Sequence, residues 1–312
     1  MTYCALAYYI FTPIENPFQE MKNHKRFFKD RDVTGRIYIS EEGINGQMSG
    51  AQADTEAYMT WLTSFLPSVK FKVHTTDENI FPRMTIKTRK HLVALGEPAD
   101  LSKGGEHVSP KQWREMLESD EEYLLLDVRN DYEWEIGHFE GATLPPLTKF
   151  RDFPSYADQL KESLKENQDF KKTKVMMYCT GGIRCELYSA LLKARGFESV
   201  YQLDGGVIAY GQQEGNAHWK GKLFVFDDRL SVPIDGKEVE PIATCSYCGT
   251  SCDIQYNCAN MDCNTLFICC KECIEKQKGC CCNACIEAPR LRPYEREKGN
   301  KPFRKKHLIA SS

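Results

Sequence analysis

The sequence lacks an export signal and any segment long enough to cross a membrane. Its apolar start, Tyr3–Phe11, has no basic region before it and no small-residue cleavage site after it. Apolar runs elsewhere stay well short of the roughly 18 residues that a membrane helix needs. These absences argue against a secreted disulfide scaffold and against an integral membrane protein. We therefore expect a cytoplasmic protein without membrane contact.

The chain also lacks a strong overall charge. Its 312 residues include 41 Lys and Arg against 44 Asp and Glu, which gives a formal net charge of −3 at pH 7. Composition alone therefore makes no case for a nucleic-acid partner. The balance is uneven, because residues 286–312 contain 8 basic and 3 acidic side chains. Such a tail either contacts phosphates or is a solvated end of the chain.

The length is that of two or three domains, and the first of them mixes short strands with helices. A glycine-rich segment, Glu41–Gly50 (E-E-G-I-N-G-Q-M-S-G), is predicted to be a turn. The order β-α-β-β-α-β predicts a ferredoxin-like (acylphosphatase-like) α+β domain over residues 1–96. The predicted strands are Cys4–Phe11, Gly35–Ser40 and Val69–His74, with Met84–Ile86 or Leu92–Leu95 completing the sheet, and the predicted helices are Pro17–Lys29 and Ala51–Leu66.

After a linker at Gly96–Glu106, the pattern becomes strand, turn, helix, repeated. The strands are continuously apolar, as buried parallel strands are, so residues 107–220 are predicted to form an α/β domain. In such sheets, sites lie beyond the carboxyl ends of the strands, and Cys179 follows one of these ends. The predicted strands are Tyr123–Val128, Lys174–Tyr178 and Val200–Leu203, and the predicted helices are Pro110–Leu117, Tyr156–Lys165, Ile183–Arg195 and Gly205–Gln212.

The stretch around Cys179, Y-C-T-G-G-I-R-C-E, has the chemistry of an anion cradle. Two glycines can turn backbone N–H groups inward, and the helix that begins at Ile183 points its positive end the same way. Such a cradle lowers the pKa of the thiol and makes Cys179 the candidate nucleophile. A structural turn around a buried cysteine is the alternative. The cradle residues are Thr180, Gly181, Gly182, Ile183 and Arg184.

Several side chains near this stretch are candidates for supporting roles. Asp127 and Arg129 are expected to pair and hold a strand end. Glu133 is expected to be exposed or to start a helix, and His138 is expected to serve the fold. Cys185 either packs in the core or resolves an oxidised or persulfurated Cys179 as a disulfide.

Twelve of the 15 cysteines fall between Cys245 and Cys285. In a reducing compartment such clustering predicts metal binding, and zinc takes four thiolates that usually arrive as short-spaced pairs. We therefore predict up to two structural zinc sites in a cysteine-rich region, 221–312, which ends in the basic tail. An iron–sulfur cluster is the alternative. The predicted ligands are Cys245, Cys248, Cys258, Cys263, Cys270, Cys273, Cys281 and Cys285, although the sequence does not settle the choice between Cys269 and Cys270 or among Cys280, Cys281 and Cys282.

Three motifs in order, D-V-R-N-D-Y-E-W at Asp127, C-T-G-G-I-R-C at Cys179 and D-G-G-V at Asp204, resemble the rhodanese family. In that family the residue matching Cys179 carries sulfur as a persulfide, and the six-residue loop here resembles that of sulfurtransferases. With E-E-G-I-N-G at Glu41 and N-C-A-N-M-D-C-N at Asn257, the whole chain resembles the rhodanese-domain tRNA uridine hydroxylases.

This resemblance implies O2-dependent hydroxylation of wobble uridine 34 in tRNA to 5-hydroxyuridine, with Cys179 essential. We find no flavin or haem motif. RNA contacts are expected from the basic tail and from a basic strip in the first domain, at Arg83, Lys87, Arg89 and Lys90. Two other functions stay open: a sulfurtransferase that carries a cysteine persulfide, and a non-enzymatic zinc-dependent RNA-binding module.

Overall fold

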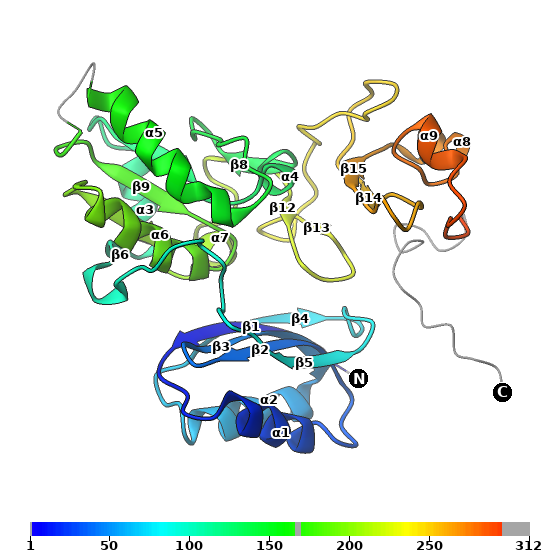
Figure 1. The fold of residues 1–312 in the computed structure, drawn as a ribbon, viewed down its shortest axis with the longest axis horizontal. Coiled ribbons are helices and arrows are strands. Elements are labelled where there is room, and N and C mark those ends of the chain that lie inside the picture. The colour runs from blue at the N-terminus through cyan, green and yellow to red at the C-terminus, as the bar shows by residue number, and fades with distance from the viewer. Residues whose placement is uncertain (1, 166–169, 295–312) are drawn as a thin grey trace.

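The computed structural model describes residues 2–165 and 170–294 (Figure 1). A sheet with two helices forms the amino-terminal part, an α/β layer structure forms the middle, and a segment of short elements carries the cysteines. The fold class predicted from the sequence is confirmed. Within the described residues, the helices are all too short or too polar to span a bilayer.

The amino-terminal domain is a five-stranded sheet covered by helices on one face. The strand order is β4-β1-β3-β2-β5, antiparallel except for the β2–β5 pair. Side chains such as Tyr8, Ile37 and Met48 pack under the helices, while the opposite face of the sheet turns toward the middle domain (Figure 1). The elements are β1 (Tyr3–Phe11), α1 (Pro17–Phe27), β2 (Val33–Ser40), β3 (Gly43–Ala51), α2 (Gln52–Thr63), β4 (Lys70–Thr76) and β5 (Met84–Thr88).

The turn predicted at Glu41–Gly50 is present only at Glu41 and Glu42, which join β2 to β3, and the prediction is wrong for the remaining residues, which belong to β3. The glycines of this segment predicted a turn. In the structure they lie where neighbouring groups approach too closely to leave room for a side chain. A Cβ atom on Gly46 would lie 2.2 Å from the Tyr8 ring, and one on Gly50 would lie 2.6 Å from the Asp32 carbonyl oxygen. The close approach of Tyr8 lets its hydroxyl reach that of Tyr58 in α2.

The middle domain is built on a parallel sheet of order β6-β10-β9-β7. All three strands predicted there are present, and α3 begins at Pro110 behind a capping box from Ser109. The short β6, α4, β8 and β11 were not predicted. The elements are β6 (Glu106–Val108), α3 (Pro110–Leu117), β7 (Leu124–Asp127), α4 (Asp131–Trp134), β8 (Gly137–Phe139), α5 (Phe153–Lys165), β9 (Val175–Tyr178), α6 (Ile183–Ala194), β10 (Val200–Leu203), α7 (Gly206–Glu214) and β11 (Trp219–Gly221).

The cysteine-rich segment contains only short elements in its described part. Cysteines supply much of its buried core, with a few aliphatic and aromatic side chains such as Ile274 and Tyr256. The elements are β12 (Leu223–Phe224), β13 (Ser231–Val232), β14 (Gln255–Asn257), β15 (Leu266–Ile268), α8 (Lys271–Lys276) and α9 (Asn283–Ile286). β12 and β13 pair antiparallel as a short hairpin.

Hydrogen bonds join the open face of the first sheet to the other two parts of the chain. The Tyr9 hydroxyl donates to Glu186 in α6 at 2.8 Å, and the Lys72 ammonium donates to the Gly181 carbonyl oxygen at 2.9 Å. The Arg36 guanidinium donates to the Phe226 carbonyl oxygen, just after β12. The sheet of the first domain therefore lies directly over the loop that follows Cys179.

Candidate functional site

Cys179 follows the last residue of β9, and the loop after it wraps around its sulfur. The Gly182 backbone has φ of 101°, which glycine tolerates, and its N–H donates to Cys179 Sγ at 3.1 Å. Helix α6 begins at Ile183, the next residue, so the positive end of its dipole lies at the same sulfur. The side chain of Cys179 is fully buried. The predicted cradle of backbone donors is thus present in the structure.

The D-G-G-V motif holds the other side of this loop. The backbone N–H groups of Val207 and Ile208 donate to the carbonyl oxygens of Cys179 and Thr180, at 3.0 and 3.1 Å. Gly206 has φ of 66°, and a Cβ atom there would lie 2.5 Å from the Cys179 carbonyl oxygen. The first turn of α7 can therefore reach the loop only because this residue has no side chain.

These surroundings decide the ionisation of Cys179. Burial raises the pKa of its thiol, but a hydrogen bond from the Cys185 thiol, the Arg184 charge and the backbone N–H groups of Arg184 and Cys185 lower the pKa to about 5. At neutral pH the sulfur is therefore a thiolate, the reactive form.

Cys185 lies in the first turn of α6 and is completely buried. Burial raises the pKa of this thiol well above its ordinary value, and the neighbouring Cys179 raises it further. Cys185 therefore keeps its proton and donates it in a hydrogen bond to the Cys179 thiolate. This role combines core packing with electrostatics.

Arg184 does not stand free over the sulfur, because a buried carboxylate holds it. Its guanidinium makes two bonds to the Glu133 carboxylate, at 2.5 and 2.8 Å, and Thr180 Oγ1 donates to the same carboxylate at 3.2 Å. Burial raises the pKa of Glu133, but the Arg184 charge, the Arg184 hydrogen bonds, the Arg129 charge and the Asn130 N–H together outweigh burial and leave the pKa lowered. Of the two expectations for Glu133, exposure is wrong and the helix start is right, since it caps α4 through the Asn130 N–H.

Asp127 and Arg129 form the pair that was expected at the end of β7. Both are fully buried, with bonds of 2.9 and 2.6 Å from the guanidinium to the two carboxylate oxygens. The guanidinium also donates to the Gly137 carbonyl oxygen at 2.6 Å, and it lies over the ring of Trp219. Because these contacts reach β8 and β11, the pair links the end of β7 to those two strands.

A cavity of about 280 Å³ opens beside Cys179, and the first domain supplies one of its walls. From β1, β3 and β4 come Tyr9, Asn45, Gln47 and Lys72, and from the loop come Thr180 and Gly181. Sequence reasoning missed this wall entirely. Alternation of polar and apolar residues along β3 was the only available signal, and its glycines hid it.

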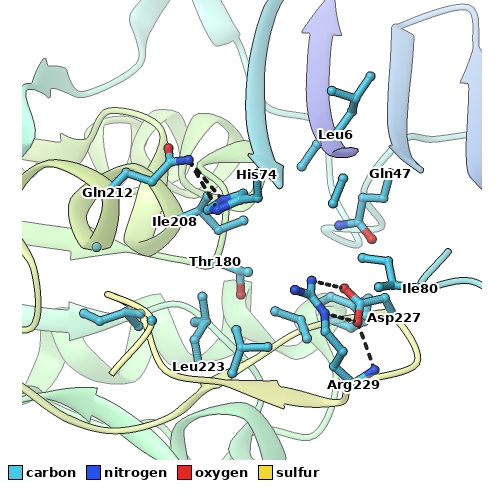
Figure 2. Close-up of a pocket in the computed structure, with 18 of the residues that line it drawn as sticks. Leu6, Gln47, His74, Ile80, Thr180, Ile208, Gln212, Leu223, Asp227 and Arg229 are labelled. Carbon is cyan, nitrogen blue, oxygen red and sulfur yellow. Dashed lines mark hydrogen bonds and ion pairs between the residues drawn. The ribbon is translucent and has the colours of Figure 1, made fainter. Parts of the chain in front are cut away.

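A second cavity, of about 510 Å³, adjoins the first and shares Gln47, Thr180 and Ile208 with it. Figure 2 shows its polar groups on opposite walls: Gln212 donates to the His74 ring, and Arg229 pairs with Asp227 at 2.7 Å. Burial lowers the pKa of His74, and the Arg229 charge lowers it further. The two cavities together are larger than one aromatic ring would fill.

The basic strip predicted to contact RNA lies on and around β5, at an edge of the first sheet. Its four candidates are all exposed, and Lys87 is the ladder neighbour of Tyr38, whose side chain lines the Cys179 cavity. The strip therefore leads toward the cavity. The basic tail beyond residue 294 lies outside the described residues.

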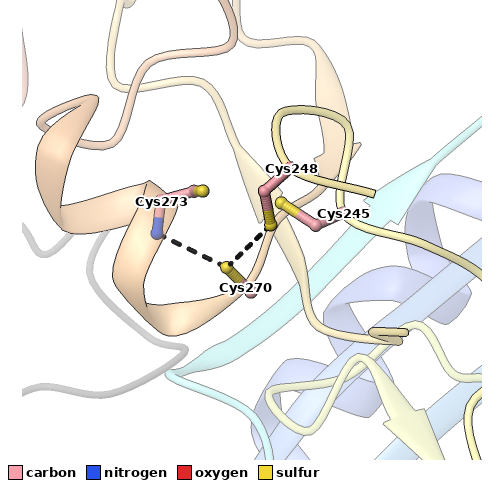
Figure 3. Close-up of side chains that lie close together, drawn as sticks. All are labelled: Cys245, Cys248, Cys270 and Cys273. Atoms are coloured by element: carbon pink, nitrogen blue, oxygen red, sulfur yellow. Dashed lines mark hydrogen bonds between the residues drawn. The ribbon is translucent and has the colours of Figure 1, made fainter. Parts of the chain in front are cut away.

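The eight predicted metal ligands come together in two groups of four. Within each group all sulfurs lie within 4.8 Å of one another, and all are free thiols. Figure 3 shows one group, with sulfurs from a loop and from the start of α8 converging on a common centre. The groups are Cys245, Cys248, Cys270 and Cys273, and Cys258, Cys263, Cys281 and Cys285.

The sulfur separations fit a tetrahedral metal ion. A Zn–S bond of about 2.3 Å gives tetrahedron edges of roughly 3.8 Å. The observed distances are 3.8 Å for Cys248–Cys270, 3.7 Å for Cys263–Cys281 and 3.9 Å for Cys281–Cys285. Backbone N–H groups donate to Cys270 Sγ and to Cys258 Sγ, each at 3.4 Å, as they do toward thiolates. These cysteine clusters could therefore hold metal ions.

Comparison with known proteins agrees with this division of the chain. Residues 3–92 match the family described as UPF0176 acylphosphatase like domain, residues 109–213 match the Rhodanese-like domain, and residues 220–286 match Rhodanase C-terminal. The three matches follow the first sheet, the α/β domain and the cysteine-rich segment.

Curated relatives match nearly the whole chain. A tRNA uridine(34) hydroxylase of Chlamydia felis is 60% identical, covering 99% of this chain and 95% of its own length. Proteins of the same name from Chlamydia abortus and Protochlamydia amoebophila are 61% and 55% identical, each covering 98% of this chain and 94% and 95% of their own lengths. On this identity and coverage, the chain belongs to the tRNA uridine(34) hydroxylase family.

Proposed function

We propose that this protein hydroxylates C5 of uridine 34 in tRNA to give 5-hydroxyuridine, with O2 as co-substrate and Cys179 as the catalytic residue. The observation that carries the proposal is a thiolate buried at the wall of a cavity between two domains, in a chain about 60% identical to named hydroxylases over almost its whole length. A tRNA substrate implies a cytoplasmic location.

Hydroxylation at C5 requires an activated pyrimidine ring, an oxidant and a source of electrons. Hydroxylation by O2 replaces C5–H with C5–OH and releases the second oxygen atom as water, which takes two electrons and two protons from a reductant. A thiolate is a nucleophile that can form a covalent intermediate with the substrate or carry the transferred atom. In either case the Gly182 N–H and the start of α6 stabilise negative charge at the Cys179 sulfur.

The remaining parts have supporting roles in this proposal. The two cysteine groups hold structural zinc, because a segment with so few aliphatic side chains gains its stability from metal binding. Arg83, Lys87, Arg89 and Lys90 contact tRNA phosphates, and the basic tail adds to them. We place the domains at 1–96, 107–220 and 221–312, in line with the three family matches.

The test compares tRNA from cells whose only copy of the gene encodes the native protein or Cys179→Ala. Mass spectrometry of the nucleosides is expected to show 5-hydroxyuridine with the native protein and none with the variant. Cys4→Ala is the matched control, because Cys4 is a buried cysteine of the first sheet that does not line the cavity. Undiminished 5-hydroxyuridine in the Cys179→Ala strain would refute the assignment.

A second function, sulfur transfer, is favoured by the cradle itself, which would hold a persulfide as well as a thiolate. Rapid formation of thiocyanate from thiosulfate and cyanide, dependent on Cys179, would support it. A non-enzymatic RNA-binding role predicts instead that tRNA binding and the modification profile both survive Cys179→Ala.

A further inference from the structure

The face of the first sheet that covers Cys179 carries an ordered set of polar side chains. Strand register places Lys72 beside Ala7 and Ala7 beside Gln47, across β4, β1 and β3. The neighbouring row places Asn45 between two aromatic residues, Tyr9 and Tyr38. Ladder neighbours project from the same face, so both rows point into the cavity that they line.

Two of these side chains are amides with free hydrogen-bonding capacity. Among the described residues, neither the Asn45 nor the Gln47 side chain has a hydrogen-bond partner, although both are partly buried at the cavity wall. Each amide offers two donors and a carbonyl acceptor. Because both amides face the cavity with these groups uncommitted, they are available to hydrogen-bond a polar ligand there.

Lys72 gives the cavity a group that can only donate. One of its three N–H donors bonds to the Gly181 carbonyl oxygen at 2.9 Å, and the ammonium lies 5.2 Å from the centre of the Tyr9 ring. Two donors remain for a ligand. An ammonium in this place favours an acceptor oxygen and disfavours an amino group.

We propose that Asn45, Gln47 and Lys72 form the element that recognises a uracil ring beside Cys179, with Lys72 donating to O4. This inference rests on the proposed function, since it assumes that a base leaves the RNA stack and enters the cavity. The amides bind the N3–H and carbonyl groups of the ring, but an amide can turn over and would accept cytosine as well. The Lys72 ammonium cannot bind cytosine in the same way, because it only donates, and cytosine presents an amino donor where uracil presents the acceptor O4.

The cavity volume agrees with this assignment. About 280 Å³ is slightly below the usual range for ligand sites, so the part of the space beside Cys179 suits one pyrimidine ring. Burial lowers the pKa of Lys72, while the nearby Cys179 and Asp204 charges raise it. The Lys72 ammonium also contacts the reactive loop directly, through the Gly181 carbonyl oxygen.

The experiment measures binding of two short anticodon stem-loop RNAs, identical except for U or C at position 34, to the full-length protein without O2 so that no turnover occurs. We expect the native protein to prefer the U34 RNA by about tenfold, the usual discrimination from one well-placed base-edge contact. Lys72→Met should bring the ratio of the two affinities close to one, and Lys72→Arg should restore part of it. Gln47→Leu should weaken both RNAs.

Lys70→Met is the matched control, because Lys70 points the same way on β4 but is exposed and does not line the Cys179 cavity. It should keep the native preference for U34. A native protein without preference, an unchanged ratio in Lys72→Met, or equal loss of preference in Lys70→Met would overturn the inference. Absence of 5-hydroxyuridine from the tRNA of cells that express the native protein would instead refute the proposed function, so the two failures are distinguishable.

Discussion

Replacing Cys185 with Ala tests how the fold keeps Cys179 ionised. The substitution removes a buried thiol that donates a hydrogen bond to the Cys179 sulfur. In the native protein burial raises the pKa of Cys179, yet this bond, the Arg184 charge and nearby backbone N–H groups lower it to about 5. The sulfur is then about 99% thiolate at pH 7, two pH units above its pKa.

The size of the change follows from the strength of that hydrogen bond. A hydrogen bond to a charged group contributes about 1.5–3 kcal/mol, and about 1.4 kcal/mol corresponds to one pKa unit. A thiol is a weak donor, so we expect the lower end of this range and a rise of about one unit. Cys185→Ser should keep the pKa of Cys179 close to its native value, because a hydroxyl donates at least as well.

The assay follows the ultraviolet absorbance of the thiolate as pH is lowered under reducing conditions. Subtracting the same titration of Cys179→Ala removes the signal of the other cysteines. The thiolate signal should be lost through about pH 5 in the native protein and through about pH 6 in Cys185→Ala. A native midpoint near that of an ordinary thiol, or the same midpoint in Cys185→Ala, would refute this account of the cradle.

Three further predictions concern the supports of the site. Glu133→Gln should destabilise the protein by about 3–5 kcal/mol in denaturant unfolding, because it removes the carboxylate that pairs with the buried Arg184 charge; an effect below about 1 kcal/mol would contradict the buried pair. Gly206→Ala should lower 5-hydroxyuridine formation by about 100-fold, since the added Cβ pushes on the Cys179 carbonyl; native activity would show that the loop tolerates displacement. Cys245→Ser should reduce the zinc content from two ions per chain to one, and strong chelators should raise hydrogen exchange throughout the cysteine-rich segment; intact protection without metal would argue against structural zinc.

Local sequence patterns predicted much of the middle domain because its signals are contiguous. An apolar strand, two glycines and a helix start lie within a few residues around Cys179, so backbone geometry alone forms the cradle. The β3 strand was missed for the opposite reason. Its glycines are explained by contacts with Tyr8 and with residues near Asp32, which no local pattern encodes.

The charge balance of the site also depended on distant residues. The sequence placed Arg184 in the loop beside the sulfur but gave no sign of a counterion for it. Its partner Glu133 lies 51 positions away, and only the packing of α4 against the loop brings the two together. The expectation that Glu133 could be exposed was wrong, because the sequence of a short helix does not show which distant residues will bury its first turn.

The sequence by itself singled out Cys179 as the candidate nucleophile and most of the cysteines that can bind metal, because short spacing fixes how such residues are presented, but it did not choose among Cys280, Cys281 and Cys282. Tertiary structure alone decided that the cysteine pairs interleave, so that Cys245 and Cys248 join Cys270 and Cys273 across an intervening pair. It also decided that Lys72, 109 positions from Gly181, covers the reactive loop. Both outcomes depend on long-range packing, which brings together residues that share no local pattern.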